Sequence, residues 1–472
     1  MKKIKSIVLA CSVAIASFTA CNDTLDINTD PLSASSADPN VILPYVFVQH
    51  SARKVTELGT RICDVSQYIS ATFNSPKLGN VSGTLSGNTW GMLYSQILGN
   101  LQLVINDAEA SGATSNNVNA IAKILSANAF YEATSIWGDV PFTEALDGVA
   151  FPSPKFDNQE TVLNGVVRLL DESIVLIDAI PADAFIINPN SDMYYGGDMS
   201  KWRILANSLK LRSLMLLKSG GADVTTQINA ALSQPLMQSN SEAAFLEYAG
   251  GPGASNGTFT IITAFFGPDN ESQNVFGPGD PIDNLLNGSG DPRWDLWVAR
   301  NTLPAPGNAV FPDTSTSVLS NNVIRATLAD VLMQPSEIDL YKAQLALEGF
   351  ATAGSAMVNY QNGIKNSIEW WGKDGSNIVN TVSDADIALY LGTLTTPTIN
   401  DVYNEQYLAS FLMPVLAWNN VRRNKVPVLA TPPGSSIPTF LKRFNYPPDE
   451  IGANVNTPSP LPTNTPMWFE NL

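Results

Sequence analysis

The hydrophobic positions of this chain recur mainly at spacings of three and four residues. From Trp90 to Ala108 they form one stripe that contains Leu93, Tyr94, Ile97, Leu98, Leu101 and Ile105. Residues 118–137 follow with closely spaced alanines, and Gly138 and Pro141 then interrupt the pattern. Such spacing places apolar side chains on one face of an α-helix, and Gly followed by Pro ends it. The pattern therefore predicts a mainly all-α fold.

A pair of helices is predicted in the C-terminal half. Ser336 precedes one apolar helical stripe, Gly349 and Gly354 bracket a turn, and Tyr360 and Trp371 belong to a second stripe. The whole unit has about the length of a tetratricopeptide repeat, in which paired helices stack into a scaffold. We therefore expect a tetratricopeptide-like scaffold of helical pairs.

Two further helices are predicted from capping and breaking residues. Ser200 is placed to cap a helix that carries Trp202, and residues 402–423 have the pattern of a third long helix. Pro414 lies inside the latter pattern, and proline removes one helical hydrogen bond, so we expect a kink there.

The helical pattern breaks between about residues 250 and 334. Glycine and proline cluster at 250–253, 267–268 and 277–281, which indicates turns and loops. Aromatic residues such as Phe265, Phe266 and Trp294 lie among them and argue against disorder. We expect one helical domain over residues 41–472, with a long irregular, loop-rich binding face inserted at about 250–334.

The N-terminus has the layout of a bacterial lipoprotein signal. Three lysines precede an apolar run that is too short to span a bilayer, and small residues lead to Cys21. We expect residues 1–20 to be the signal peptide, Cys21 to be acylated, and residues 21–40 to be a lipidated tether. An ordinary secretory signal is the alternative. Cys11 would leave with the signal peptide, and the third cysteine, Cys63, is expected to be a small buried apolar residue.

The chain is strongly acidic. Removal of residues 1–20 takes away three lysines and no acids, which changes the formal net charge from −17 to −20. Such a charge repels phosphate backbones, so no nucleic-acid partner is expected. No phosphate-binding or dinucleotide motif occurs, and no cofactor is expected.

The sequence offers little catalytic chemistry. His50 is the only histidine. A zinc site needs several His or Cys ligands and a nucleophilic triad needs a histidine base, so neither is expected and no metal site is predicted. A calcium site whose oxygen ligands come from separate loops remains an alternative. A hydrolase would need two carboxylates across a groove. Glu369 is the candidate for one of these carboxylates, although we favour the interpretation that it is a solvent-exposed residue on a helix.

Aromatic and amide side chains give a better functional signal. Sugar rings present C–H faces that stack on aromatic rings, and an exposed ring is costly unless it binds something. Tyr360 and Trp371 fall on the apolar stripe, whereas Trp370 is one residue off it and is expected to be exposed. The ligand-binding candidates are Phe73, Asn74, Trp90, Phe265, Phe266 and Trp370.

Several segments together resemble the SusD/RagB family of outer-membrane lipoproteins of Bacteroidetes. Residues 136–146 read Ile-Trp-Gly-Asp-Val-Pro-Phe-Thr-Glu-Ala-Leu, and residues 194–198 read Tyr-Tyr-Gly-Gly-Asp. Ala-Asn-Ser-Leu-Lys-Leu-Arg at 206–212, Asp-Pro-Arg at 291–293 and Ala-Trp-Asn-Asn-Val-Arg-Arg at 417–423 follow in the family's order. Further matches lie at 26–31, 90–94, 335–346, 360–372 and 443–450, and the chain departs from the family at Gln344, Asn420 and Val421.

The resemblance implies a cell-surface, lipid-anchored outer-membrane protein that is not an enzyme. It would bind nutrient oligosaccharides, or peptides, and deliver them to a SusC-like TonB-dependent transporter. The family's motif residues are expected to be structural, with capping, packing and ion-pair roles for Asp139, Trp202, Arg212, Arg293 and Arg422. A surface glycoside hydrolase and a structural helical-repeat interaction protein are the alternatives.

Overall fold

The computed structural model describes residues 38–55, 60–71, 81–266, 276–300, 317–375, 378, 380–431 and 434–470. The chain divides into two units at Asp38, and the elements below belong to the unit Pro39–Leu472. The helices of its N-terminal half are α2 (Pro39–Arg53), α3 (Thr60–Val65), α4 (Gly83–Gly91), α5 (Gly99–Ser111), α6 (Asn116–Trp137), α7 (Gln159–Asp178), α8 (Met199–Ser219) and α9 (Thr225–Leu232). The later helices are α10 (Gly257–Phe266), α12 (Asp280–Leu286), α13 (Arg293–Trp297), α14 (Pro335–Leu347), α15 (Ala356–Glu369), α16 (Asp384–Leu391), α17 (Ile399–Ala409), α18 (Pro414–Asn424) and α19 (Pro448–Ala453). The mainly helical fold that the sequence predicts is confirmed.

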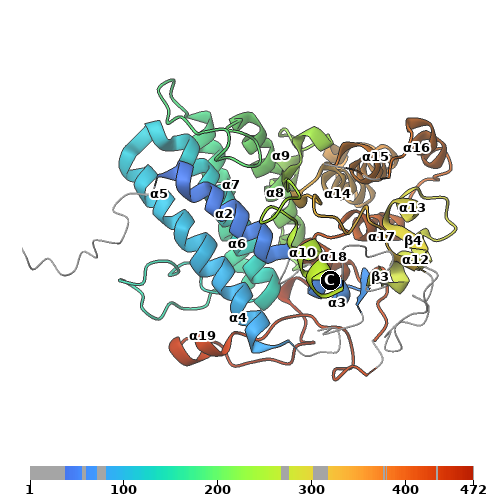
Figure 1. Ribbon diagram of the computed structural model, residues 1–472. Helices are drawn as coiled ribbons and strands as arrows, with labels where there is room; N and C mark the ends of the chain where they lie inside the picture. Colours follow the sequence, from blue (N-terminus) through green and yellow to red (C-terminus); the bar gives the residue numbers. More distant parts are fainter. Residues whose placement is uncertain are drawn as a thin grey trace, which may run out of the picture. The chain divides into compact units, whose positions relative to one another are not determined.

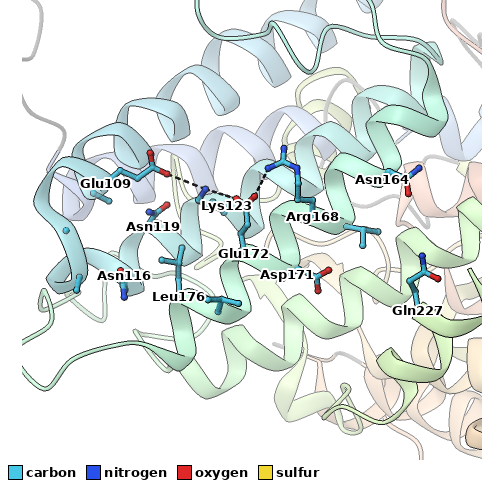
Figure 2. Close-up of a pocket in the computed structure, with 15 residues that line it drawn as sticks. Glu109, Asn116, Asn119, Lys123, Asn164, Arg168, Asp171, Glu172, Leu176 and Gln227 are labelled. Carbon is cyan, nitrogen blue, oxygen red and sulfur yellow. Dashed lines mark hydrogen bonds and ion pairs between the residues drawn. The ribbon is translucent and has the colours of Figure 1, made fainter.

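Helices α5 to α9 form a layer in which each helix packs against its neighbours in the chain (Figure 1). Helix α6 is buried over almost its whole length, and its alanines permit the close approach of α5 and α7. Gly138 ends α6 at a φ of +88°, a conformation that costs glycine little. A groove of about 820 Å³ runs along α7 where it faces α5 and α6 (Figure 2).

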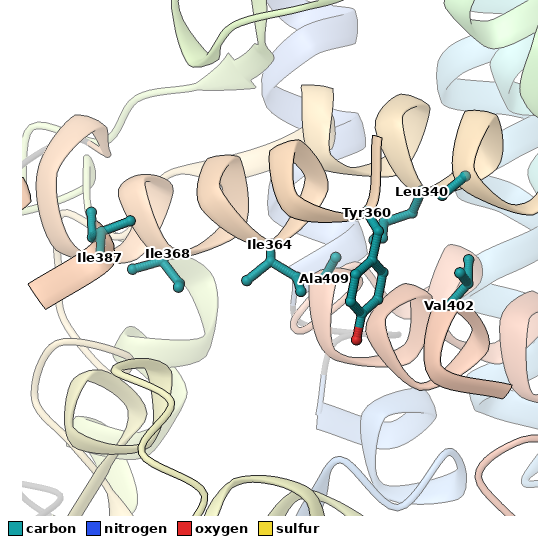
Figure 3. Packing of buried hydrophobic residues seen from close by; sticks show 8 residues of the cluster. Leu340, Tyr360, Ile364, Ile368, Ile387, Val402 and Ala409 are labelled. Atoms are coloured by element: carbon teal, nitrogen blue, oxygen red, sulfur yellow. The ribbon is translucent and has the colours of Figure 1, made fainter. Parts of the chain in front are cut away.

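The predicted C-terminal helix pair is confirmed as α14 and α15. Its apolar stripes meet α16 and α17 in a cluster whose members have exposed fractions of at most 8% (Figure 3). Gly363 permits the close contact of the pair, because a Cβ atom there would lie 2.6 Å from Leu340 Cγ. Tyr360 and Trp371 are buried, as predicted.

One buried acid on α14 gives this helix pair a pH-dependent stability. Asp339 accepts a hydrogen bond of 2.9 Å from Asn366 Nδ2, and burial raises the pKa of Asp339 to about 6. The folded protein therefore holds this proton where the unfolded chain has lost it, so stability falls as the pH rises from about 4 to about 6.

We expect Asp339→Asn to be more stable than the wild type by about 1–3 kcal/mol at pH 8, because an amide avoids the buried charge and keeps an acceptor for Asn366. Urea unfolding at pH 4 and pH 8 measures this difference. Equal stabilities of the two proteins at pH 8 would contradict the role of Asp339.

Two local predictions are wrong. Residues 402–423 form two helices rather than one kinked helix, because α17 ends at Ala409 and Pro414 occupies the first turn of α18, where its missing N–H costs nothing. The cap of α8 is Asp198, whose carboxylate accepts from the N–H groups of Ser200 and Lys201. A carboxylate also suits the positive end of the helix dipole.

The irregular region contains short helices and strands, and these strands form two-stranded antiparallel sheets with one another or with a strand outside the region. The strands are β1 (Ile69–Ala71), β2 (Ala244–Leu246), β3 (Phe276–Pro278), β4 (Val298–Arg300), β5 (Ser317–Leu319) and β6 (Asp330–Met333). They pair as β1–β3, β2–β6 and β4–β5. Two of these pairs join segments far apart in the sequence, and this explains why the region has no helical periodicity and yet is packed.

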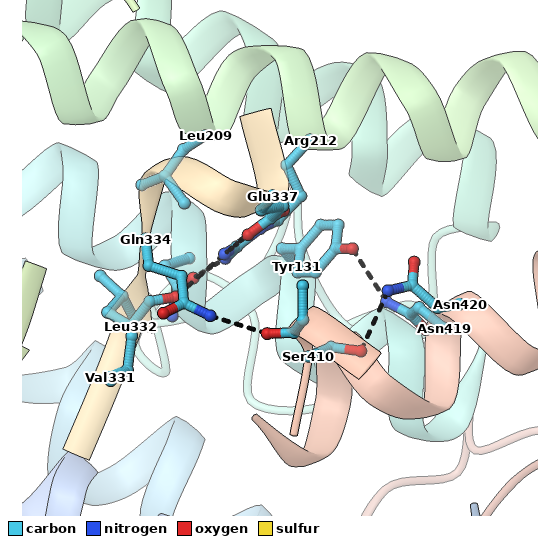
Figure 4. Close-up of polar contacts among 12 residues, drawn as sticks. Tyr131, Leu209, Arg212, Val331, Leu332, Gln334, Glu337, Ser410, Asn419 and Asn420 are labelled. Atoms are coloured by element: carbon cyan, nitrogen blue, oxygen red, sulfur yellow. Dashed lines mark hydrogen bonds and ion pairs between the residues drawn. The ribbon is translucent and has the colours of Figure 1, made fainter. Parts of the chain in front are cut away.

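Buried polar side chains join the two helical halves (Figure 4). Arg212 on α8 binds Glu337 on α14 through two hydrogen bonds of 2.7 and 2.6 Å and donates to the carbonyl of Leu332. Asn419 on α18 donates to the hydroxyl of Tyr131 on α6. These contacts confirm the structural role that we expected for Arg212. None of the described helices is long and apolar enough to cross a membrane.

Candidate ligand-binding groove

A second groove, of about 860 Å³, lies in the irregular part of the fold. One wall runs from Leu286, at the end of α12, through a turn to α13. Residues 380–382, α16 and Thr393 form the opposite wall. In Figure 1, α12 and α13 (yellow) and α16 (brown) lie on the same side of the view. We call this cleft the α13–α16 groove.

The side chains that line the α13–α16 groove are of the kinds that bind sugars. Trp294 and Tyr390 are half-buried rings, and Leu389 is 73% exposed. Ser289, Asn380, Thr381, Asp295 and Asp386 add hydroxyl, amide and carboxylate groups. A cleft of this size with apolar rings and a few convergent polar groups is the usual form of a small-ligand site.

A tight turn builds one wall of the α13–α16 groove. Gly288 and Gly290 have φ values of +77° and +82°, which glycine adopts without strain. The hydroxyl of Ser289 accepts from the N–H of Asp291, and Asp291 in turn accepts from the N–H of Arg293. The turn thus places Asp291 at the groove and starts α13 directly behind it.

A buried ionic cluster supports this wall from below. The side chain of Arg293 is fully buried and contacts Asp291 Oδ2 at 2.6 Å and Glu405 Oε2, on α17, at 2.8 Å. Tyr390 of α16 also lies close enough to this cluster to help lower the pKa of Asp291, so the cluster connects α13, α16 and α17. The structural role that we expected for Arg293 is confirmed.

The pKa values of the two acids in the cluster are shifted in opposite directions. Burial opposes the ionised form of Asp291, but Arg293 outweighs it and holds the pKa of Asp291 below its usual range. Burial raises the pKa of Glu405 above its usual range, because Arg293 offsets only part of the loss of hydration and Asp291 adds repulsion. Arg293 is therefore the group that keeps two buried acids together.

Four of the predicted ligand-binding residues stay untested. Phe73 and Asn74 lie outside the described residues, as does Cys21. Phe265 and Phe266 are the last two residues of α10, and the structure does not describe their side chains. All of them remain predictions.

Trp90 belongs to an aromatic cluster outside the α13–α16 groove. Its half-buried ring stacks on Tyr94 at 4.5 Å between centroids and lies 6.2 Å from Phe156, with Trp137 packed against it edge-on at 4.9 Å. These contacts give the ring a packing role. Its binding of ligand stays a prediction.

The expected exposure of Trp370 is wrong. The ring is buried and meets Phe245 at 5.1 Å. After Glu369 the chain continues as a π-helical turn, Trp370–Asp374, which has more residues per turn than an α-helix. Trp370 and Trp371 therefore both face the interior, and an α-helical projection could not place them correctly.

Two titratable residues from the sequence analysis are buried beside polar partners. Glu369 is buried rather than solvated, and its carboxylate lies 2.6 Å from Lys365 Nζ and 3.7 Å from Lys373 Nζ. His50 Nε2 lies 3.0 Å from Glu132, which is also buried. Cys63 is buried with a free thiol, as predicted, and burial raises its pKa to about 12.

Trp294 and Tyr390 are the groove residues that the sequence did not single out for binding. Trp294 directly follows Asp-Pro-Arg, a sequence typical of a turn, and an aromatic residue next to a turn is a candidate for ligand contact. Tyr390 had no such signal, because α16 brings it to the groove only through tertiary packing. In the described part of the chain, no three His, Cys, Asp or Glu side chains are grouped to hold a metal ion.

Comparison with known proteins gives a consistent result. A SusD-like family described as "Starch-binding associating with outer membrane" matches residues 35–447. Similar solved structures include a "chitin-binding protein" (TM-score 0.75, 22% identity, covering 92% of this chain and 100% of that chain). A chitin-binding SusD homolog from Flavobacterium johnsoniae has a TM-score of 0.72 and 18% identity and covers 92% of this chain and 97% of its own.

A SusD homolog from Bacteroides uniformis is also similar, with a TM-score of 0.74 and 20% identity over 92% of this chain and 99% of that chain. No curated protein sequence matches significantly. At these identities the solved structures establish a shared fold.

Proposed function

This chain belongs to the SusD-like family, whose description is starch-binding and associating with the outer membrane, and from this premise we propose that it captures oligosaccharides at the cell surface in the α13–α16 groove. The observation that carries the proposal is the presence of two half-buried rings, Trp294 and Tyr390, among hydroxyl, amide and carboxylate groups in a cleft of about 860 Å³. Two of the structurally similar proteins are described as chitin-binding, which supports a carbohydrate as the ligand.

The proposed mechanism is binding without chemistry. The rings would stack on the C–H faces of sugar units, and the polar groups of the groove would fix their orientation. The buried Asp291–Arg293–Glu405 cluster would keep the wall in place before the ligand arrives, which lowers the entropic cost of binding. The captured ligand would then pass to a SusC-like TonB-dependent transporter.

The anchor in this proposal is the acylated Cys21. The apolar run that precedes Cys21 and the polar tether that follows it support lipidation. Mass spectrometry of the mature N-terminus tests it. A diacylglyceryl group on Cys21 supports the anchor, and an unmodified N-terminus after a different cleavage excludes it.

The binding proposal is tested by calorimetry with residues 22–472 and a panel of malto-oligosaccharides, chito-oligosaccharides and short peptides. We expect saturable binding of an oligosaccharide and no release of product in the same samples. Hydrolysis would establish the glycosidase alternative, for which Asp295 and Asp386 would be the first acids to replace because both line the groove.

We expect Trp294→Ala to weaken oligosaccharide binding at least about tenfold, which corresponds to about 1.4 kcal/mol. The reason is the loss of the stacking surface, since Trp294 is half-buried and its removal leaves the core intact. The matched control is Tyr45→Ala, which removes an exposed ring from α2, outside the groove. Equal affinities for the wild type and Trp294→Ala would place the sugar site elsewhere.

A further inference from the structure

The charged side chains that line the α13–α16 groove all have the same sign. They are Asp291, Asp295 and Asp386, and no lysine or arginine is among the described residues that line it. The carboxylate of Asp291 lies 2.6 Å from the buried guanidinium of Arg293, which offsets its charge. Asp295 and Asp386 are exposed, so their carboxylates are the charges that a bound ligand meets.

Each wall of the groove combines one of these two carboxylates with an aromatic ring. On α13, Asp295 directly follows Trp294, and both line the groove. On α16, Asp386 and Tyr390 are four residues apart, a spacing that places two side chains on the same face of a helix. A ligand in the groove therefore lies between two walls, each of which offers a ring and a carboxylate.

The carboxylate of Asp386 is held in place by its own helix. Its Oδ2 atom accepts a hydrogen bond of 2.6 Å from the hydroxyl of Ser383. The same hydroxyl caps α16 by accepting from the N–H of Asp386 at 3.1 Å. A side chain that is already ordered in the free protein lowers the entropic cost of binding.

Lys373 is the basic residue closest in sequence to α16, and two acids offset its charge. Its Nζ atom lies 2.7 Å from Asp384 and 3.7 Å from Glu369. The formal net charge of the whole chain is −17, so the wider surroundings add a negative field. The groove is thus an environment that attracts cations and repels anions.

An ammonium group suits both features of each wall. The carboxylates attract it as an opposite charge, and the faces of tryptophan and tyrosine rings attract cations through their quadrupole. Amino sugars carry such a group beside the C–H faces that stack on rings, whereas uronic acids carry a charge that both carboxylates repel. Two contacts between opposite charges at a solvated surface are enough for a preference of about tenfold.

We infer that the α13–α16 groove prefers oligosaccharides that carry free amino groups over neutral ones and excludes acidic ones, with Asp295 and Asp386 as the residues that set this preference. The inference rests on the proposed capture of oligosaccharides and adds the charge class of the ligand. Trp294 and Tyr390 would supply the stacking that all these sugars share, and the two carboxylates would supply the discrimination.

The test compares tetrasaccharides on one β-1,4-linked backbone, composed of glucose, N-acetylglucosamine, glucosamine or glucuronic acid. Calorimetry with residues 22–472 is carried out at about pH 5.5, where amino groups are protonated. We expect the glucosamine tetramer to bind at least about tenfold more tightly than the glucose tetramer, and the glucuronic acid tetramer at least about tenfold more weakly. Higher salt should reduce both differences, because it screens exposed charges.

Removal of both charges should abolish the preference while neutral sugars still bind. In a variant with Asp295→Asn and Asp386→Asn, the glucosamine tetramer should bind no more than about twofold more tightly than the glucose tetramer. The affinity for the glucose tetramer should change little, because asparagine keeps the shape of aspartate and one acceptor oxygen. Thermal unfolding shows whether the variant is folded.

Two further variants show that the preference belongs to the groove. Asp183→Asn is the matched control, since it removes the charge of an exposed aspartate outside the groove and should leave the preference unchanged. Trp294→Ala should weaken binding of the glucosamine tetramer as well as of the neutral tetramers.

Equal affinities for the glucosamine and glucose tetramers would overturn the inference and leave the proposed function standing. A preference that survives in the variant without Asp295 and Asp386 would do the same. Binding of maltotetraose with no binding of any β-1,4-linked tetramer would also overturn the inference alone. If no saccharide binds at millimolar concentration, the proposed function fails and the inference fails with it.

Discussion

Replacement of Arg293 by methionine is expected to lower the free energy of unfolding by about 3–5 kcal/mol at neutral pH. The guanidinium is fully buried between Asp291 and Glu405 and also contacts Ser367 Oγ at 3.3 Å. Methionine fills much of the same volume but leaves two buried acids facing each other. Urea unfolding at pH 8 measures the loss.

The same variant should be less destabilised at pH 5 than at pH 8. Without Arg293, the pKa of Asp291 is no longer held low, and burial raises the pKa of Glu405 further. Groups whose pKa is raised in the folded state hold protons that the unfolded chain has released, so the stability of the variant falls as the pH rises. Adding Glu405→Gln to Arg293→Met should recover part of the loss by removing one charge.

The matched control is Arg168→Met, since the side chain of Arg168 is 60% exposed and paired with Glu172 on the same helix. Exposed pairs of this kind contribute only about 0–1 kcal/mol. Equal losses for the two arginine variants, or a loss at Arg293 that does not depend on pH, would contradict the ionic role of Arg293. Oligosaccharide binding should also weaken in Arg293→Met, because Asp291 and Tyr390 line the α13–α16 groove.

Replacement of Gly279 by alanine is expected to lower the free energy of unfolding by about 3 kcal/mol, at the upper end of the usual effect of overpacking. A Cβ atom at this position would lie 1.9 Å from the carbonyl oxygen of Gln67. The φ of Gly279 is −75°, which alanine adopts readily, so the effect comes from the contact and not from backbone strain. The backbone fixes the position of Cβ, and the oxygen that it meets belongs to the backbone, so no side-chain rotation relieves the contact.

The clash falls at the end of the β1–β3 pair, where Gly279 N donates to Tyr68 O at 2.9 Å. Tyr68 stacks on Tyr407 of α17 at 3.9 Å, so displacement of β1 also disturbs the core. Urea unfolding of Gly279→Ala measures the loss. A loss below about 0.5 kcal/mol, the usual range for surface substitutions, would show that the two segments separate easily.

Gly91→Ala is the matched control for Gly279→Ala. Gly91 lies at the end of α4 with helical angles, and a Cβ atom there would meet nothing within 4 Å. Alanine is favoured over glycine in a helix by about 1 kcal/mol. The control should therefore be as stable as the wild type or more so, although the substitution is chemically the same.

The sequence alone determined most of the helical scaffold. The alanine-rich pattern that ends at Gly138 predicted α6, and the two stripes around Gly349 and Gly354 predicted α14 and α15. These features are local, because the helical period and the breaking residues act within a few positions of one another. The order of the motifs along the chain also identified the family, which the match over residues 35–447 confirms.

Only the tertiary structure decided where grooves form and which distant residues meet. Arg293 and Glu405 are separated by 112 positions, and no local pattern announces that they share one buried cluster. Trp370 seemed one residue off the apolar stripe, but a π-helical turn and the packing of Phe245 bury it. The α13–α16 groove and the groove along α7 each form between elements that the chain brings together from separate segments. Periodicity fixes which face of a helix is apolar, whereas a cleft depends on which helices meet and how closely.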